Sequence, residues 1–174
     1  MRYSEIMKLP LESEGCRFAA SGDWWVIFES AIIAESAQIG AFSKIGPCVE
    51  IGNDVQIGSY TSILEEAVIS ESVTIAAEVR IGPHVHVVGS PLQIVGPKYT
   101  VYPYTPGIIG IGCQIGSIAQ WEEHFESWAE EYYVPDADVL LYRCYVELIH
   151  DWMIEAKKTG TFTRARKAVR DENR

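Results

Sequence analysis

Two histidines separated by a single residue form the local cluster in this sequence that most strongly indicates a chemical role. His84 and His86 flank Val85, which the repeat described below points inward, so both imidazoles are expected to project from the outer surface of one strand. A catalytic zinc site needs a third ligand, and no further His or Cys lies at a suitable spacing, so we expect no metal. Either imidazole is a candidate general base toward a hydroxyl or amine. The alternative is that both pack at a subunit contact.

Aromatic and basic residues around and after the histidines form a second candidate site. The aromatic rings could stack on a nucleotide base, and the cations or the basic C-terminal tail could contact phosphate. The full candidate ligand-binding set is His84, His86, Arg80, Lys98, Tyr99, Tyr102, Tyr104 and Trp121. The alternative for the aromatic residues is that they pack in a core.

A repeat of six residues must position these side chains. Its aliphatic series is Ile33, Ile39, Ile45, Ile51, Ile57, Ile63, Ile69, Ile75, Ile81 and Val87. Smaller or β-branched residues stand two positions before each of these, and residues two apart share one face of a strand. Helices need apolar spacings of three and four, which excludes a helix here. We therefore predict a mainly β protein whose residues 31–96 form a parallel β-helix of about three coils.

The remaining segments lack the repeat. The predicted segments are an N-terminal cap (1–30), connecting strands (97–116), a helical hairpin (117–158) and a basic, flexible tail (159–174). Ser117 and Gln120 have the spacing of a capping box at the start of the hairpin. The second helix, expected from Pro135 or Asp136, carries two apolar stripes, one through Leu141 and Leu148 and one through Tyr142, Val146, Ile149 and Met153. Two stripes imply two burial surfaces, the first helix and either the β-helix or a neighbouring subunit.

Charge and cysteine content narrow the range of partners. The 174 residues carry a formal net charge of −10, but half of the 14 Lys and Arg residues lie from Lys157 onward. The acidic body disfavours nucleic acid as a partner. The four scattered cysteines do not have the spacing of a disulfide framework or a metal site, and no apolar run is long enough to span a membrane. We expect a cytoplasmic protein without a membrane partner.

The repeat over residues 31–88 resembles that of left-handed β-helix, hexapeptide-repeat acyltransferases. The resemblance implies a left-handed coil, a homotrimer, an acyl-coenzyme A donor and an interfacial catalytic histidine. Residues 81–88 look like the coil that precedes the active site of sugar acetyltransferases, which commonly continue with a His-Pro pair. Here Ser90-Pro91 occupies that region, so His84 or His86 would have to serve instead.

A second resemblance involves residues 111–122, which contain Ile111-Gly112-Cys113, Ser117-Ile118 and Trp121-Glu122. This segment is similar to the ending of phage and prophage hexapeptide-repeat proteins of unassigned function. It implies a phage-type origin. Together with the trimer that the first resemblance implies, it leads to the hypothesis of a protein that holds a small ligand between its subunits, for example a nucleotide-like host defence signal, and that needs no cofactor. The alternatives are an acyl-coenzyme A-dependent O- or N-acyltransferase and a protein that contacts a host protein.

Overall fold

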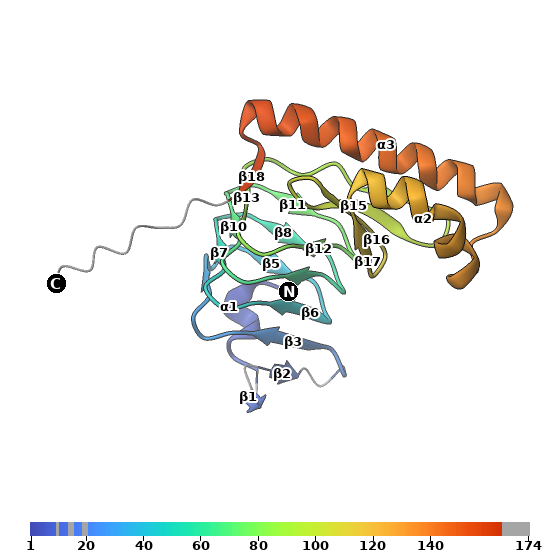
Figure 1. Cartoon of the computed structure of the whole chain (residues 1–174). Coiled ribbons are helices and arrows are strands. Elements are labelled where there is room, and N and C mark those ends of the chain that lie inside the picture. The colour runs from blue at the N-terminus through green and yellow to red at the C-terminus, as the bar shows by residue number, and fades with distance from the viewer. Residues whose placement is uncertain (10, 14–15, 19–20, 165–174) are drawn as a thin grey trace.

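The computed structural model describes residues 1–9, 11–13, 16–18 and 21–164 (Figure 1). Its main body is a three-sided solenoid in which each side is a parallel sheet. The first sheet contains β3 (Trp24–Ile27), β6 (Ser43–Ile45), β9 (Ser62–Ile63) and β12 (Arg80–Ile81). The second contains β4 (Ile32–Ile33), β7 (Glu50–Ile51), β10 (Val68–Ile69) and β13 (Val85–Val87). The third contains β5 (Gln38–Ile39), β8 (Gln56–Ile57) and β11 (Thr74–Ile75).

The predicted parallel β-helix is confirmed, and its stack is about four turns high. Strand β3, which lies inside the predicted N-terminal cap, pairs in parallel register with β6 and adds a layer below the hexads. Each coil takes three hexads, because residues 18 apart face each other, as Val68 faces His86. The left-handed sense remains a prediction from the resemblance.

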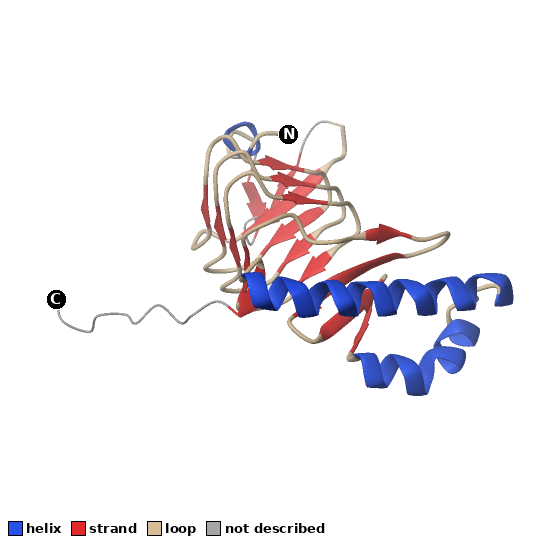
Figure 2. Cartoon of the chain, turned by 90° about the horizontal axis from the view of Figure 1, so that it is seen from above, coloured by secondary structure: helices blue, strands red, loops and turns tan. Residues whose placement is uncertain are grey.

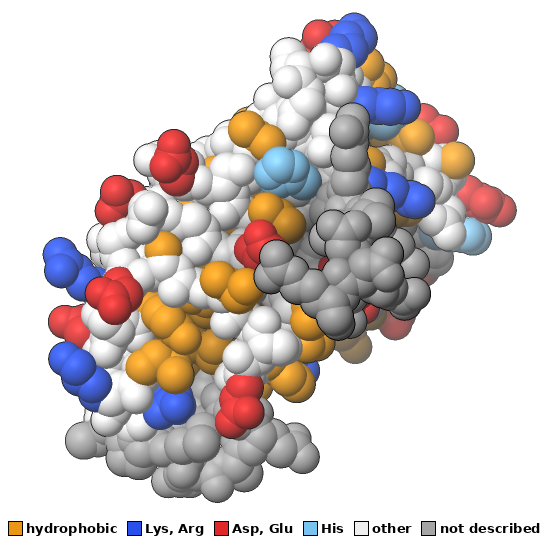
Figure 3. All heavy atoms as spheres, turned by 90° about the vertical axis from the view of Figure 1, so that its left-hand side faces the viewer, with side chains coloured by type: hydrophobic (Ala, Val, Ile, Leu, Met, Phe, Trp, Pro, Cys, Tyr) orange, Lys and Arg blue, Asp and Glu red, His pale blue; other side chains and the backbone are white. Residues whose placement is uncertain are grey.

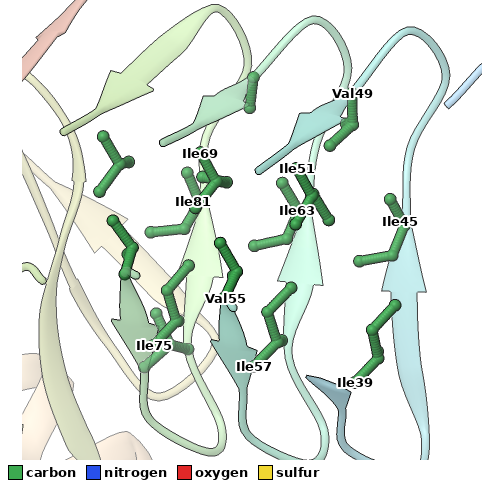
Figure 4. Close-up of a cluster of buried hydrophobic side chains, with 14 of the residues drawn as sticks. Ile39, Ile45, Val49, Ile51, Val55, Ile57, Ile63, Ile69, Ile75 and Ile81 are labelled. Carbon is green, nitrogen blue, oxygen red and sulfur yellow. The ribbon is translucent and has the colours of Figure 1, made fainter. Parts of the chain in front are cut away.

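Aliphatic ladders fill the interior of the solenoid. Ile39, Ile57 and Ile75 stack on one side, with exposed fractions of 0%, 4% and 1% (Figure 4). Their neighbours Gln38, Gln56 and Thr74 point outward and are exposed. Burial of each Ile side chain contributes about 1.5–3 kcal/mol, so the ladders are the main source of the solenoid's stability.

Every sixth residue at the corners has a positive φ, although none of them is a glycine. These residues are Phe42, Cys48, Asp54, Tyr60, Glu66, Ser72, Glu78 and His84. Left-handed backbone costs an L-residue about 1–2 kcal/mol. Backbone bonds between coils offset this cost, since the His84 N–H donates to Glu65 O at 3.0 Å and the Tyr60 N–H to Ala41 O at 2.9 Å. The stack therefore holds each corner side chain in a defined outward direction.

Different devices cover the upper edges of the three sheets. Strand β18 (Phe162–Arg164) pairs antiparallel with β13, and the Gly82 N–H after β12 donates to Tyr104 O at 2.7 Å. The side chains of Ser90 and Gln93 accept bonds from backbone N–H groups in and next to β11. The predicted basic tail thus begins with an ordered strand, and the remainder of that prediction lies outside the described residues.

The lower end is covered on two sides. Strands β1 (Leu11–Ser13) and β2 (Cys16–Phe18) extend the first sheet below β3. Met1 and Tyr3, the first residue of α1 (Tyr3–Ile6), form hydrogen bonds with the backbone around β5. Strand β4 is an edge strand of its sheet within the described residues, and its Ile32 side chain is 68% exposed.

The C-terminal part forms a second core. Strands β14 (Ile94–Val95), β15 (Thr100–Thr105), β16 (Ile108–Ile111) and β17 (Gln114–Gly116) make an antiparallel sheet. Helix α2 (Ile118–Glu131) begins at the predicted Ser117–Gln120 capping box and packs beside α3 (Asp136–Thr159), which runs across the upper end of the solenoid (Figures 1 and 2). None of the described helices is long and apolar enough to cross a membrane.

The two stripes of α3 differ in burial. Tyr142, Val146, Ile149 and Met153 are buried in the second core. The other stripe stays partly open, because Leu141 is 37% and Leu148 52% exposed. The helical hairpin therefore covers one of the two apolar surfaces of α3 more completely than the other.

Candidate functional site

The His84 side chain leaves a corner of the solenoid and pairs with a carboxylate one coil below. Its Nδ1 lies 3.0 Å from Oε2 of Glu66, which holds the equivalent corner 18 residues earlier. The two side chains are 47% and 52% exposed, so the pair is open to solvent. Both residues have a positive φ, which is why both side chains project from the same edge of the prism.

This pairing sets which nitrogen of His84 can act as a base. In a neutral imidazole, one nitrogen carries the proton and the other a lone pair. The Glu66 carboxylate accepts hydrogen bonds, so it favours the proton on Nδ1 and leaves the Nε2 lone pair free. A base oriented by a third group in this way is the arrangement that activates hydroxyl and amine nucleophiles.

His86 lies on β13, just after the corner that carries His84, and has a different partner. Its side chain is half-buried on the outer face of β13, beside β18, and its Nε2 lies 3.2 Å from Oγ of Ser70. Val85 between the two histidines is fully buried, which confirms that both flank an inward residue. The imidazoles nevertheless bond to residues in different columns of the stack, so they form two separate pairs. Figure 3 looks onto this side of the solenoid, where histidine, acidic and hydrophobic side chains are exposed together.

A shallow hollow lies beside the second pair. It is lined by Gly52, Asn53, Ser70, Glu71, Ser72 and Val88. Oδ1 of Asn53 accepts a hydrogen bond from Ser36 Oγ at 3.4 Å. The hollow is thus lined by three polar groups: the hydroxyl of Ser70, which contacts a histidine, the amide of Asn53 and the carboxylate of Glu71.

The aromatic residues of the candidate ligand-binding set lie mostly in the interior. Tyr102 is fully buried and donates to Gly112 O at 2.7 Å, and Trp121 is 5% exposed and donates from Nε1 to Ile109 O at 3.1 Å. Tyr104 is 9% exposed. Burial raises the pKa of Tyr102 to about 12, partly opposed by the Arg80 cation. These rings offer little surface for stacking on a ligand in this conformation.

The two cations of that set bond to backbone carbonyls. Arg80 donates from Nη1 to Cys113 O at 3.3 Å and lies over the Tyr104 ring. Lys98 donates from Nζ to Tyr132 O at 2.8 Å and lies over the half-buried Tyr99 ring. Arg80 thus connects β12 to the residue before β17, and Lys98 connects the loop before β15 to the end of α2. Neither contacts the histidine pairs on β13 and its preceding corner. The structure thus separates the predicted set into two groups.

Sequence reasoning missed Glu66, Ser70 and Asn53. Glu66 could have been found by subtracting one coil of 18 residues from His84, because residues at this spacing stack at the same corner. Ser70 is a diagonal neighbour of His86, 16 residues earlier, and simple stacking does not identify it. Among the described residues, no group of three or more His, Cys, Asp or Glu side chains could hold a metal ion.

Part of the solenoid is similar to a known family of repeat proteins. The family model of the bacterial transferase hexapeptide (six repeats) matches residues 30–65, which include β4 to β9. Glu66 and His84 both lie outside the matched residues. No curated protein matches the chain, and the predicted phage relation therefore has no relative to rest on. The repeats that form the lower coils of this solenoid are therefore similar to those of bacterial hexapeptide transferases over residues 30–65.

Proposed function

We propose that this protein transfers an acyl group from an acyl thioester to a hydroxyl or amine, with His84 as the general base. The observation that carries the proposal is the His84–Glu66 pair, which is solvent-accessible and leaves Nε2 free. The similarity of residues 30–65 to the bacterial transferase hexapeptide model supports the same reaction class. Fold alone does not determine activity, so the argument depends on the pair itself.

The pair can perform both proton transfers of the reaction. Nε2 of His84 takes the proton of the acceptor as its oxygen or nitrogen attacks the thioester carbon. When the carbon–sulfur bond breaks, the imidazolium returns this proton to the leaving thiolate. The Glu66 carboxylate, 3.0 Å from Nδ1, stabilises the imidazolium between these two steps.

Cations for a phosphorylated donor lie around the corner from His84. Lys44, Ser62 and Arg80 occupy one column on the outer face of the first sheet, in register on β6, β9 and β12. Lys44 is exposed, whereas Arg80 is half-buried and already donates to Cys113 O, so Lys44 is the cation of this column that is open to a phosphate. An acyl-coenzyme A lying along this face would bring its thioester toward the corner that carries His84. We propose that a second subunit of a homotrimer covers this face and completes the site.

A nucleotide-binding role has less support from the geometry. It relied on aromatic rings that are mostly buried and on two cations that bond to carbonyls. Thiol release measured together with the melting temperature separates the two roles. A binder that is not an enzyme would show a ligand-dependent rise in melting temperature without turnover.

The test is thiol release from acetyl-coenzyme A in the presence of a panel of sugar and amine acceptors. His84→Ala should lower turnover by about 100-fold or more, since a positioned general base contributes about 10²–10⁴-fold. Glu66→Gln should cause a smaller loss, because the imidazole keeps a hydrogen-bond partner but loses the charge. The matched control is His124→Ala, because His124 is an exposed histidine on α2.

Two results would overturn the proposal. One is the absence of thiol release with every acceptor. The other is turnover that His84→Ala leaves unchanged. Sedimentation of the wild-type protein tests the homotrimer separately, and a monomer at micromolar concentration would remove the intersubunit site.

A further inference from the structure

The Ser70–His86 pair is not required by the repeat. In the column of His86 the other coils carry Ile32, Glu50 and Val68, and in the column of Ser70 they carry Ala34, Gly52 and Val88. Neither an imidazole nor a hydroxyl is therefore needed to build these positions. The coincidence of both groups at 3.2 Å, in one place on the outer face, needs another explanation.

The hollow next to this pair gives a small molecule access to Ser70. Ser70 is one of the lining residues, and Gly52, one coil below it, contributes no side chain that would fill the space. The hollow is open to solvent, and both Ser70 and His86 are half-buried rather than enclosed. An acyl group could therefore reach the serine oxygen from outside.

Asn53 supplies a hydrogen-bond donor in the same hollow. Because its Oδ1 accepts from Ser36 Oγ at 3.4 Å, the amide nitrogen is the end left to face a ligand, and it has no hydrogen-bond partner among the described residues. A side-chain amide placed beside a nucleophile can stabilise the oxyanion that forms when a carbonyl is attacked.

We propose that Ser70, His86 and Asn53 form a second reactive site that hydrolyses small carboxylic esters through an acyl-serine. Nε2 of His86 accepts the Ser70 proton as Oγ attacks the carbonyl carbon, and Asn53 binds the oxyanion. The carbon–oxygen bond to the leaving alcohol breaks, and His86 protonates the alcohol. Water then attacks the acyl-serine, giving one proton to His86, which returns it to Ser70 as the carboxylic acid leaves.

The charge of the hollow determines the class of ester. Glu71 places a carboxylate among the lining residues, and it is exposed. It repels anionic acyl donors, so phosphorylated thioesters should react poorly here and neutral or cationic esters well. This site goes beyond the acyl transfer proposed for His84 and does not depend on it, because it needs neither a thioester donor nor a second subunit.

The test uses the full-length protein and para-nitrophenyl acetate. We expect nitrophenolate release with an initial burst and, after rapid acid quenching, one acetyl group on Ser70 by peptide mass spectrometry. Ser70→Ala should lose the acetylated peptide and the burst, whereas Ser127→Ala, which changes an exposed serine on α2 outside the hollow, should retain both. His86→Gln should slow acetylation by about 100-fold, because it removes the base.

Two further variants keep the outcome decisive. Ser70→Cys retains a nucleophile if Ser70→Ala fails to fold, and it should be acetylated at the same position. Asn53→Leu should slow acetylation by about 10²-fold or more if its amide binds the oxyanion. Acetylation confined to lysines, histidines or tyrosines, or an unchanged burst in Ser70→Ala, would overturn the proposal. No acetyl-coenzyme A enters this assay, so its failure leaves the His84 reaction untouched, and the reverse also holds.

Discussion

The solenoid and the C-terminal part are both well packed, but they satisfy their buried polar groups in different ways. In the solenoid, backbone bonds join residues of adjacent coils, such as Gln56 N–H to Val73 O at 2.9 Å, and the interior is almost entirely aliphatic. In the C-terminal part, aromatic side chains donate and accept across long stretches of sequence, such as Tyr142 to residues 43 and 44 positions earlier. The first core is thus specified by a period and the second by individual pairs.

The largest expected effect comes from placing a charge in an aliphatic ladder. Ile57→Asp buries a carboxylate at a position that is 4% exposed and surrounded by the apolar core of the solenoid, which should cost more than about 3 kcal/mol. We expect no soluble folded protein, measured by expression and circular dichroism. Gln56→Asp, one residue earlier and exposed, is the control and should fold. A native melting curve for Ile57→Asp would contradict the ladder.

A smaller effect is expected from adding one methyl group between coils. At Gly58 a Cβ would lie 2.3 Å from the backbone nitrogen of Ala77 in the next coil, whereas at Gly110 it would meet the side-chain ring of Tyr102 at 2.4 Å. A stacked backbone cannot move as a side chain can. Gly58→Ala should therefore destabilise the protein by about 1–3 kcal/mol and Gly110→Ala by less, both measured by urea unfolding. The reverse order would show that the aromatic core is the stiffer of the two.

Removing the Tyr142 hydroxyl tests the long-range hydrogen bonds of the C-terminal part. The Tyr142 hydroxyl oxygen accepts from the N–H groups of Lys98 at 2.9 Å and Tyr99 at 2.7 Å. Tyr142→Phe leaves these donors without that partner, so the free energy of unfolding should fall by about 1–3 kcal/mol. Tyr145→Phe is the control, since this hydroxyl has no hydrogen-bond partner among the described residues. Hydrogen exchange should locate the loss in residues 94–116, and equal effects of the two variants would contradict the assignment.

The smallest effect is a dependence on pH at Tyr102. Its pKa is raised to about 12 in the folded protein by burial, so its contribution to stability is complete below its ordinary pKa of 10.0 and is lost as pH rises toward 12. Tyr102→Phe removes the bond to Gly112 O and should lower stability at pH 7 by about 1 kcal/mol. The difference from wild type should shrink between pH 10 and pH 12, followed by urea unfolding. A constant difference would show that the phenol does not titrate with unfolding.

The same contrast explains what could be predicted from the sequence. The solenoid and its inward residues were predictable because every hexad shows the same spacing of aliphatic residues. The outward position of both histidines followed from the inward position of Val85 between them. Helix α2 was predictable from Ser117 and Gln120, whose spacing is a local signal. The pairing of β18 with β13 was not, because it joins residues more than 70 positions apart without a periodic pattern.

The partners of the histidines show the same limit. Glu66 lies at a spacing that the coil length predicts, but that length becomes certain only when three hexads are known to form each coil. The tyrosines were open to two interpretations, ligand stacking or core, because composition does not reveal which side of an irregular sheet is buried. Tyr102 and Trp121 illustrate this, since both are buried and donate to backbone carbonyls, Tyr102 in the core of the solenoid and Trp121 in the second core.

The unequal ends of the solenoid have a consequence for aggregation. Stacked parallel strands are a template on which further strands can add, and a molecule with open edges at both ends could grow into a fibre. Here β18, the residues around β15 and the Ser90–Gln93 side chains occupy the upper edges, while β4 is an edge strand below. Two molecules could meet at this lower edge, whereas in the part of the chain that the structure describes the upper strands β11, β12 and β13 already have partners. The elements that close the upper end thus limit the length of the stack as well as stabilising it.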